Sequence, residues 1–168
     1  MPVSISGDGV VTGLASLDSP TTVNGLTIPT TGFGKVLQVV QGSTTTSTGT
    51  TSASYVDTTL TVTITPSSTG SKILIMTSQS LAYDGAGSTV IDWQIVRDST
   101  SIAEFPRYIF SSGSQASQGT FAASWLDSPA TTSATVYKTQ FKRSAGSNTI
   151  QAQNVSARSV IIAIEVAA

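Results

Sequence analysis

The chain has 168 residues, a formal net charge of −1, and neither cysteine nor histidine. Disulfides, thiolate metal sites and acid–base catalysis by histidine are therefore excluded. The eight basic residues are scattered, whereas nucleic-acid-binding proteins cluster their Lys and Arg, so we expect no nucleic-acid partner. The longest apolar runs fall far short of the ~20 residues that cross a bilayer. We therefore expect no membrane insertion, and the first residues predict no signal peptide.

Hydroxyl side chains dominate the composition. The chain has 27 Ser and 27 Thr, about a third of its residues, whereas charged residues make up only 10%. Thr and Val favour strands, while Ser and Gly favour turns. A surface so poor in charge favours association, so we expect much of it to lie against another subunit.

Residues 1–34 carry two charges, Asp8 and Asp18, and repeated turn signals such as Asn24-Gly25. Their short apolar positions cannot form a core of their own. We predict an extended N-terminal anchoring arm that packs on another molecule. The alternative is a strand or two packed on the chain's own domain. The predicted anchoring positions are Ile5, Val10, Val11, Leu14, Leu17, Val23, Leu26 and Ile28.

From Lys35 onward apolar and polar residues alternate with the period of a strand. Residues 35–41 predict a short strand, and residues 42–54 predict a polar loop or an exposed edge. The next two strands, 55–65 and 72–80, flank a turn at 66–70, and together they predict a hairpin.

Three further strands are predicted in the middle of the chain. In the first, Ile91, Trp93 and Ile95 share a face. A turn at 98–101 leads into residues 102–110, where Pro106 predicts an edge strand or a bulge. The third strand contains Trp125, and we expect both tryptophans to pack in the core.

The last part of the chain continues the pattern. Residues 135–142 alternate, a hairpin turn is predicted at 144–147, and the final strand at 159–166 places Val160, Ile162, Ile164 and Val166 on one side. No segment has a helical period with caps. Residues 35–168 therefore predict an all-β knob, an antiparallel β-sandwich of jelly-roll type with very little helix.

Few residues point to catalysis. Most carboxylates flank turns, where they cap the backbone. Asp92 and Glu104 lie on predicted strands and are the better candidates for a glycosidase-like pair. We expect no active site, metal or cofactor. Polar loops could instead hydrogen-bond to host-surface glycans. The candidate glycan contacts are Thr46, Thr48, Tyr83, Asp84, Ser114 and Gln115, although packing at a strand end or a subunit interface is the favoured interpretation of Tyr83.

An ordered set of segments carries a family resemblance. They read GKVLQVVQ at 34–41, SYVDT at 54–58, TITP at 63–66, STGSKIL at 68–74, YKTQF at 137–141 and SVIIAIE at 159–165. In this order the chain resembles a family of small tailed-phage virion proteins, common among aquatic phages and often labelled tail fibre or fibre-like. The resemblance spans roughly residues 34–168.

The resemblance implies a homotrimeric β-sandwich knob on the virion surface, anchored by its N-terminal arm and assembled in the host cytoplasm. It supplies no catalytic residues. We expect a non-enzymatic structural protein, a capsid decoration (cement) protein or a short head fibre. Its partners would be its own copies and other virion proteins, either the major capsid protein or a fibre or tail component. The alternatives are a tail-fibre tip that binds host glycans and a small capsule depolymerase.

Overall fold

The structure is a computed structural model, and it describes the backbone of residues 4–5, 11–12, 21–23, 26–28, 35–112 and 117–167. Side chains are described for residues 35–106 and 117–167. The chain divides into two compact units, Met1–Gly34 and Lys35–Ala168. In the first unit β1 (Ser4–Ile5) pairs with β2 (Val11–Thr12), and β3 (Thr21–Val23) pairs with β4 (Leu26–Ile28), both antiparallel. That this unit is an extended arm stays a prediction.

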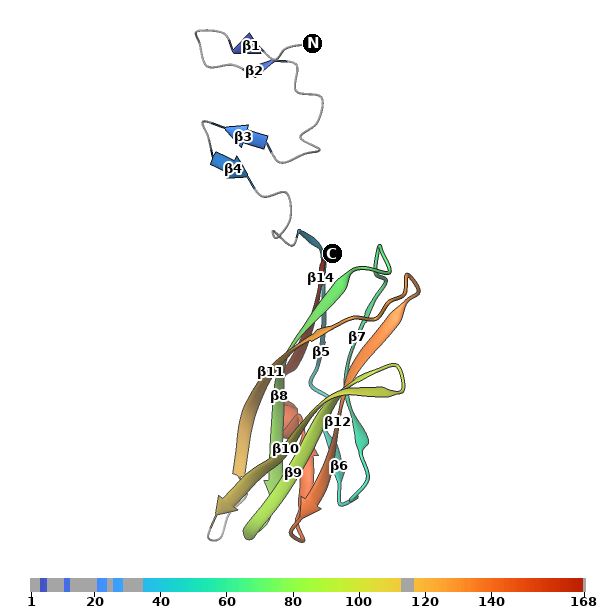
Figure 1. Cartoon of the computed structure of the whole chain (residues 1–168). Coiled ribbons are helices and arrows are strands. Elements are labelled where there is room, and N and C mark those ends of the chain that lie inside the picture. The colour runs from blue at the N-terminus through green and yellow to red at the C-terminus, as the bar shows by residue number, and fades with distance from the viewer. Residues whose placement is uncertain are drawn as a thin grey trace. The chain divides into compact units, whose positions relative to one another are not determined.

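The second unit is built from strands in two antiparallel sheets (Figure 1). The four-stranded sheet has the order β10-β9-β12-β7, and the six-stranded sheet has the order β5-β14-β8-β13-β6, with β11 on the free side of β8. The strands are β5 (Val36–Thr44), β6 (Thr48–Thr50), β7 (Val56–Ile64), β8 (Lys72–Asp84), β9 (Gly87–Arg97), β10 (Thr100–Ser112), β11 (Ser117–Asp127), β12 (Thr135–Ala145), β13 (Thr149–Ala152) and β14 (Ser159–Val166). Among the described residues the helical content is one 3₁₀ turn, Asn154–Ser156.

The order of the strands is that of a jelly roll. Strands β14 and β13 pair with successive parts of β8 along one of its sides and together form one row, and β5 and β6 together form the next row outward. The six-stranded sheet therefore has four rows. Counting rows along the chain gives the order 1-8-3-6 in this sheet and 2-7-4-5 in the other. Such interleaving of two four-row sheets is the double Greek key of a jelly roll. The expected all-β sandwich is confirmed.

Both predicted hairpins are wrong in their pairing. Strands β7 and β8 lie in different sheets, so the turn at 66–70 carries the chain across the sandwich. The turn at 144–147 likewise leads from β12 to β13 in the other sheet. The alternation of residues reports which side of a strand is buried, but it does not report which sheet the strand joins. Strands β9 and β10 do form a hairpin, with Arg97 opposite Thr100.

The core lies between the two sheets. The predicted shared face of Ile91, Trp93 and Ile95 on β9 is buried, and the core also includes Leu60, Val62 and Ile64 of β7 and Tyr137 and Phe141 of β12. The Trp93 ring stacks on Phe105 with centroids 4.7 Å apart. Trp125 was predicted in the core but is 42% exposed. It lies on β11, an edge strand that has a neighbouring strand, β8, on one side only.

Strand β10 is the edge of the four-stranded sheet, and its register with β9 shifts between Phe105 and Tyr108. Both features confirm the sequence-based interpretation of Pro106, since proline cannot donate to a ladder and is tolerated at edges and bulges.

A layer of polar side chains crosses the interior between the sheets. Thr58 and Thr139 of the four-stranded sheet hydrogen-bond to each other, and the Thr139 hydroxyl donates to Gln79 Oε1 on β8 at 2.8 Å. Gln79 Nε2 lies 3.2 Å from Ser159 Oγ. Gln153 completes the layer when its amide nitrogen faces the Thr58 carbonyl at 2.8 Å. Because buried polar groups cost free energy unless paired, this network fixes the register of one sheet against the other.

Candidate functional surfaces

The predicted anchoring positions lie in the first unit. Ile5, Val11, Val23, Leu26 and Ile28 are on strands β1 to β4, while Val10, Leu14 and Leu17 lie outside the described residues. The role of these positions as an interface stays a prediction.

The predicted glycan contacts do not form one cluster of exposed side chains. Thr46 and Asp84 are exposed and Thr48 is half-buried. Tyr83 is only 1% exposed, and its hydroxyl donates to the Gly87 carbonyl at 3.1 Å. Tyr83 is therefore not available as a glycan contact, and the packing at a strand end that the sequence favoured for this ring is confirmed. Ser114 and Gln115 lie outside the described residues.

The two candidate catalytic carboxylates lie on neighbouring strands, and the charges of both act on the Tyr55 phenol. Asp92 on β9 is 8% exposed, accepts a hydrogen bond from Ser144 Oγ at 2.9 Å, and lies 3.8 Å from Lys142 Nζ. Glu104 on β10 is exposed and lies opposite Gln94 in the ladder. Among the described residues no group of three or more His, Cys, Asp or Glu could hold a metal ion.

The outward side of the four-stranded sheet is polar. We call it the polar face and define it by Tyr55, Asp57, Asp92, Gln94, Lys138, Gln140 and Lys142. Asp57 accepts from Gln140 Nε2 at 2.8 Å and from Lys138 Nζ at 3.0 Å. Burial alone would raise the pKa of Asp57, but these two hydrogen bonds and the Lys138 charge bring it below its usual value. A shallow hollow of about 220 Å³ lies beside this pair.

An aromatic ring borders the same face. The Lys142 ammonium lies 4.4 Å from the centroid of the Tyr55 ring, a cation–π contact. Burial, together with the negative charges of Glu104 and Asp92, raises the pKa of Tyr55 to about 12. The phenol therefore stays protonated at neutral pH and keeps its hydrogen-bond donor. Sequence reasoning missed this face because its charges are scattered along the chain and meet only across strands.

The outward side of the six-stranded sheet carries an aliphatic patch along β14 and its neighbours, bordered by exposed polar residues such as Gln41, Ser43 and Ser78. We call this patch the apolar face and define it by Val39, Leu74, Met76, Leu126, Val160, Ile162, Ile164 and Val166. Val39, Met76 and Leu126 are 59%, 44% and 57% exposed. The alternate residues of β8 and β14 point inward, and Ile73, Ile75, Ile161 and Ala163 among them are fully buried. The sequence placed the β14 aliphatics on one side of the strand, and the structure shows that this is the outer side.

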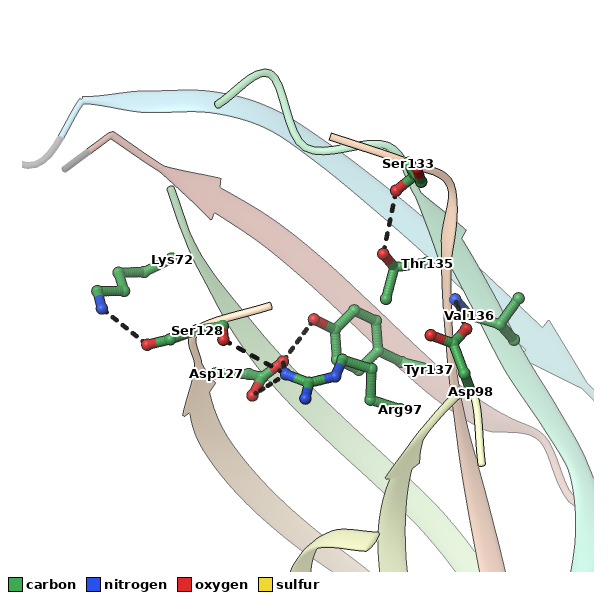
Figure 2. Close-up of polar contacts among 9 residues, drawn as sticks. All are labelled: Lys72, Arg97, Asp98, Asp127, Ser128, Ser133, Thr135, Val136 and Tyr137. Carbon is green, nitrogen blue, oxygen red and sulfur yellow. Dashed lines mark hydrogen bonds and ion pairs between the residues drawn. The ribbon is translucent and has the colours of Figure 1, made fainter. Parts of the chain in front are cut away.

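At one end of the sandwich a buried ionic contact joins the two sheets (Figure 2). Arg97 Nη1 on β9 lies 2.8 Å from Asp127 Oδ2 at the end of β11. The Tyr137 hydroxyl on β12 donates to the same oxygen at 2.7 Å. Burial and the neighbouring Asp127 carboxylate raise the pKa of Tyr137 above its ordinary value. This cluster is structural, because it connects three strands and leaves Asp127 nearly covered.

Tyr137→Phe is expected to lower the free energy of unfolding by about 1–2 kcal/mol, because the Asp127 carboxylate loses a buried charge-assisted hydrogen bond. Urea denaturation of the full chain measures the loss. In a double-mutant cycle with Asp127→Ala the two losses should be clearly non-additive, since each change removes one partner of the same hydrogen bond. Strictly additive losses would contradict this account of the cluster.

No protein-family model matches the chain, and no curated protein matches it either. Within the described part of the chain, no helix has the length and apolar character needed to cross a membrane.

Proposed function

We propose that the chain is a non-enzymatic structural protein of a bacteriophage virion. In this proposal it forms a homotrimeric surface knob that residues 1–34 anchor to the particle, and it acts as a capsid decoration (cement) protein or a short head fibre. It would be assembled in the host cytoplasm and would bind its own copies and other virion proteins, either the major capsid protein or a fibre or tail component.

The observation that carries the proposal is a jelly-roll sandwich that begins directly after a separate short unit. Double-sheet jelly rolls recur in viral capsid domains and in lectins. Because a fold alone does not imply a function, the family resemblance of residues 34–168 supplies the choice of a virion protein. A cement protein that binds assembled shells stabilises them by mass action, which gives the proposal a measurable consequence.

The test uses capsids of the encoding phage from which this protein has been stripped. The full chain is expected to bind them again and to raise their melting temperature. A chain lacking residues 1–34 should not bind, although it should still fold, because the core and the strand pairs of residues 35–167 are complete within that range. Equal binding by both chains, or binding by neither, would contradict the anchoring role. Electron microscopy of virions that carry a labelled copy of the protein gives its location. A label found only on the tail would contradict a location on the head.

The polar face supports a second candidate, a tail-fibre tip that binds host-surface glycans. Its carboxylate, amide and ammonium groups can exchange hydrogen bonds with sugar hydroxyls, and Tyr55 adds an aromatic ring at its border. Binding of the full chain to host polysaccharide, lost in Gln140→Ala but kept in Thr63→Ala on the neighbouring strand, would favour this candidate. Absence of binding at millimolar glycan would contradict it.

A further inference from the structure

We infer that the apolar face of the six-stranded sheet is the surface through which copies of this chain associate. The inference rests on the proposed self-association and names the surface that performs it. Its occupant is the same surface on other copies of the chain, so that in the proposed homotrimer the apolar faces of three copies meet around the threefold axis.

The two outer sides of the sandwich differ sharply in chemistry. On the four-stranded sheet, the outward residues of β7 are Asp57, Thr59, Thr61 and Thr63, and those of β12 include Lys138, Gln140 and Lys142. Charges on that side are paired across strands, as on a surface that faces water. The named residues of the apolar face carry no charge and no hydrogen-bonding group. Both sheets belong to the same chain, so we attribute the difference between their outer sides to a difference in what each side contacts.

Strand β14 is apolar on both sides. Its inward residues Ile161 and Ala163 fill the core, while its outward residues are four branched aliphatics in succession. An antiparallel strand with one side in water alternates between apolar and polar residues, and a strand that is apolar on both sides is typical of sheets covered on both faces. The sequence of β14 therefore indicates a covered outer side.

The neighbouring strands extend the same surface. Ile164 lies between Leu74 of β8 and Val39 of β5 in the ladder, and Ile162 pairs with Met76. The apolar side chains therefore continue across adjacent strands in a single patch. A hollow of about 160 Å³ beside Met76, Val160 and Ile162 gives the patch relief into which a side chain of another copy can insert.

Cationic residues lie at the two ends of this patch and not within it. Lys72 pairs with Val166 at one end and donates to Ser128 Oγ at 2.7 Å. Arg158 precedes β14 at the other end, and its Nη1 donates to Ser43 Oγ at 3.2 Å. An apolar centre with a polar rim is the usual anatomy of a protein–protein interface.

The size and shape of the patch fit a second sheet. The outer side of the sheet, of which the patch is the apolar part, has four rows about 4.8 Å apart and about seven residues long at ~3.4 Å each, and so covers roughly 450 Å² per copy. Two such faces together bury roughly 900 Å² before side-chain relief is counted, close to the ~1,000 Å² of a specific interface. A sheet face packs on another sheet face at ~10 Å with nearly aligned strands. Because the patch offers no charge to select a different partner, its own copy is the matching surface.

Two variants place a charge on the patch without disturbing the core. Val39→Glu and Met76→Glu alter side chains that are 59% and 44% exposed in the single chain. Thr63→Glu is the matched control, since Thr63 is exposed on the edge strand of the other sheet. Sedimentation velocity of each full-length protein gives the mass over a dilution series, and circular dichroism verifies the fold.

We expect the unmodified chain and Thr63→Glu to share one oligomeric mass, while each face variant weakens association at least about tenfold. If the unmodified chain is oligomeric and both face variants keep its mass, the inference fails and the proposed homotrimer stands. If the unmodified chain is still monomeric at about 100 μM, both the inference and the proposed homotrimer fail.

A second measurement needs no variant. Met76 is one of two methionines in the chain, and its thioether is open to peroxide when the patch is free. Peptide mass spectrometry should show slow oxidation of Met76 in the concentrated oligomer and at least about threefold faster oxidation after dilution to monomer. Equal rates at both concentrations would overturn the inference.

Discussion

Replacing Gly42 by alanine is expected to destabilise the fold by about 3 kcal/mol or more, since a rigid backbone contact leaves no room for a methyl group. A Cβ at this position would lie 1.9 Å from the Thr61 carbonyl oxygen and 3.1 Å from Ile161 Cγ2. Strand β5 is an edge of the six-stranded sheet and β7 an edge of the other, so Gly42 lies where the two sheets close on each other. Thermal or urea unfolding of the full chain measures the loss.

Gly49→Ala provides the control for this prediction. Gly49 lies on β6, and its added methyl would meet Thr149 Cγ2 at 3.5 Å, an ordinary contact. We expect a change within about 0.5 kcal/mol. If Gly42→Ala unfolds at the same denaturant concentration as Gly49→Ala, then the two sheets do not approach each other as closely at Gly42 as described.

Gly42 also shows where sequence reasoning ends. Gly42 is the first residue of the Ser/Thr-rich stretch 42–54, which predicts a loop or an exposed edge, and β5 is indeed an edge strand. A glycine is required at this position because the backbone of Thr61, on a strand of the other sheet, leaves no room for a side chain. Contacts of this kind depend on topology, and topology is not encoded in the local alternation of residues.

The predicted faces and the predicted partners of the strands had different outcomes. The alternation of Ile91, Trp93 and Ile95 correctly gave the buried side of β9, because burial of one strand face follows directly from its apolar positions. The hairpin predicted at 66–70 was wrong, because this jelly roll places the successive strands β7 and β8 in opposite sheets. The prediction that Trp125 lies in the core was wrong for a related reason. The alternation places this residue on the inward side of its strand, but it does not reveal that the strand is at the edge of the sheet.

The candidate surfaces were the least predictable part of the molecule. For β14 the sequence identified an aliphatic side but could not tell that the opposite side, with Ile161 and Ala163, fills the core. When both sides of a strand are apolar, alternation cannot choose between core and interface. The polar face likewise depends on cross-strand neighbours such as Asp57 and Lys138, which are far apart in the sequence.

Glu165 is a buried carboxylate that holds three segments together. It is fully buried on β14, and its Oε1 accepts from the Ser67 backbone N–H at 2.7 Å and from the Ser67 hydroxyl at 2.6 Å. Its Oε2 accepts from Gln38 Nε2 on β5 at 2.6 Å. Burial raises the pKa of Glu165, but the hydrogen bonds from Ser67 and Gln38 outweigh it and lower the pKa to about 2.

Because the folded-state pKa lies below the ordinary value of 4.5, the carboxylate contributes stability that is complete above that value. The contribution is lost as the pH falls from about 4.5 toward 2. We therefore expect the free energy of unfolding of the unmodified chain to fall across this interval, with the ionised Glu165 responsible for a distinct part of the fall. Urea titrations at a series of pH values measure it.

Glu165→Gln is expected to lower the free energy of unfolding by about 3 kcal/mol at pH 7. An amide presents an NH₂ group either to the Ser67 donors or to Gln38, so buried donors face each other unpaired. The difference between the variant and the unmodified chain should shrink as the pH falls toward 2, since the native carboxyl then also becomes neutral. Glu104→Gln, on the exposed side of β10, should change stability by less than about 0.5 kcal/mol at pH 7. A Glu165→Gln variant with native stability at pH 7 would contradict the role assigned to this carboxylate.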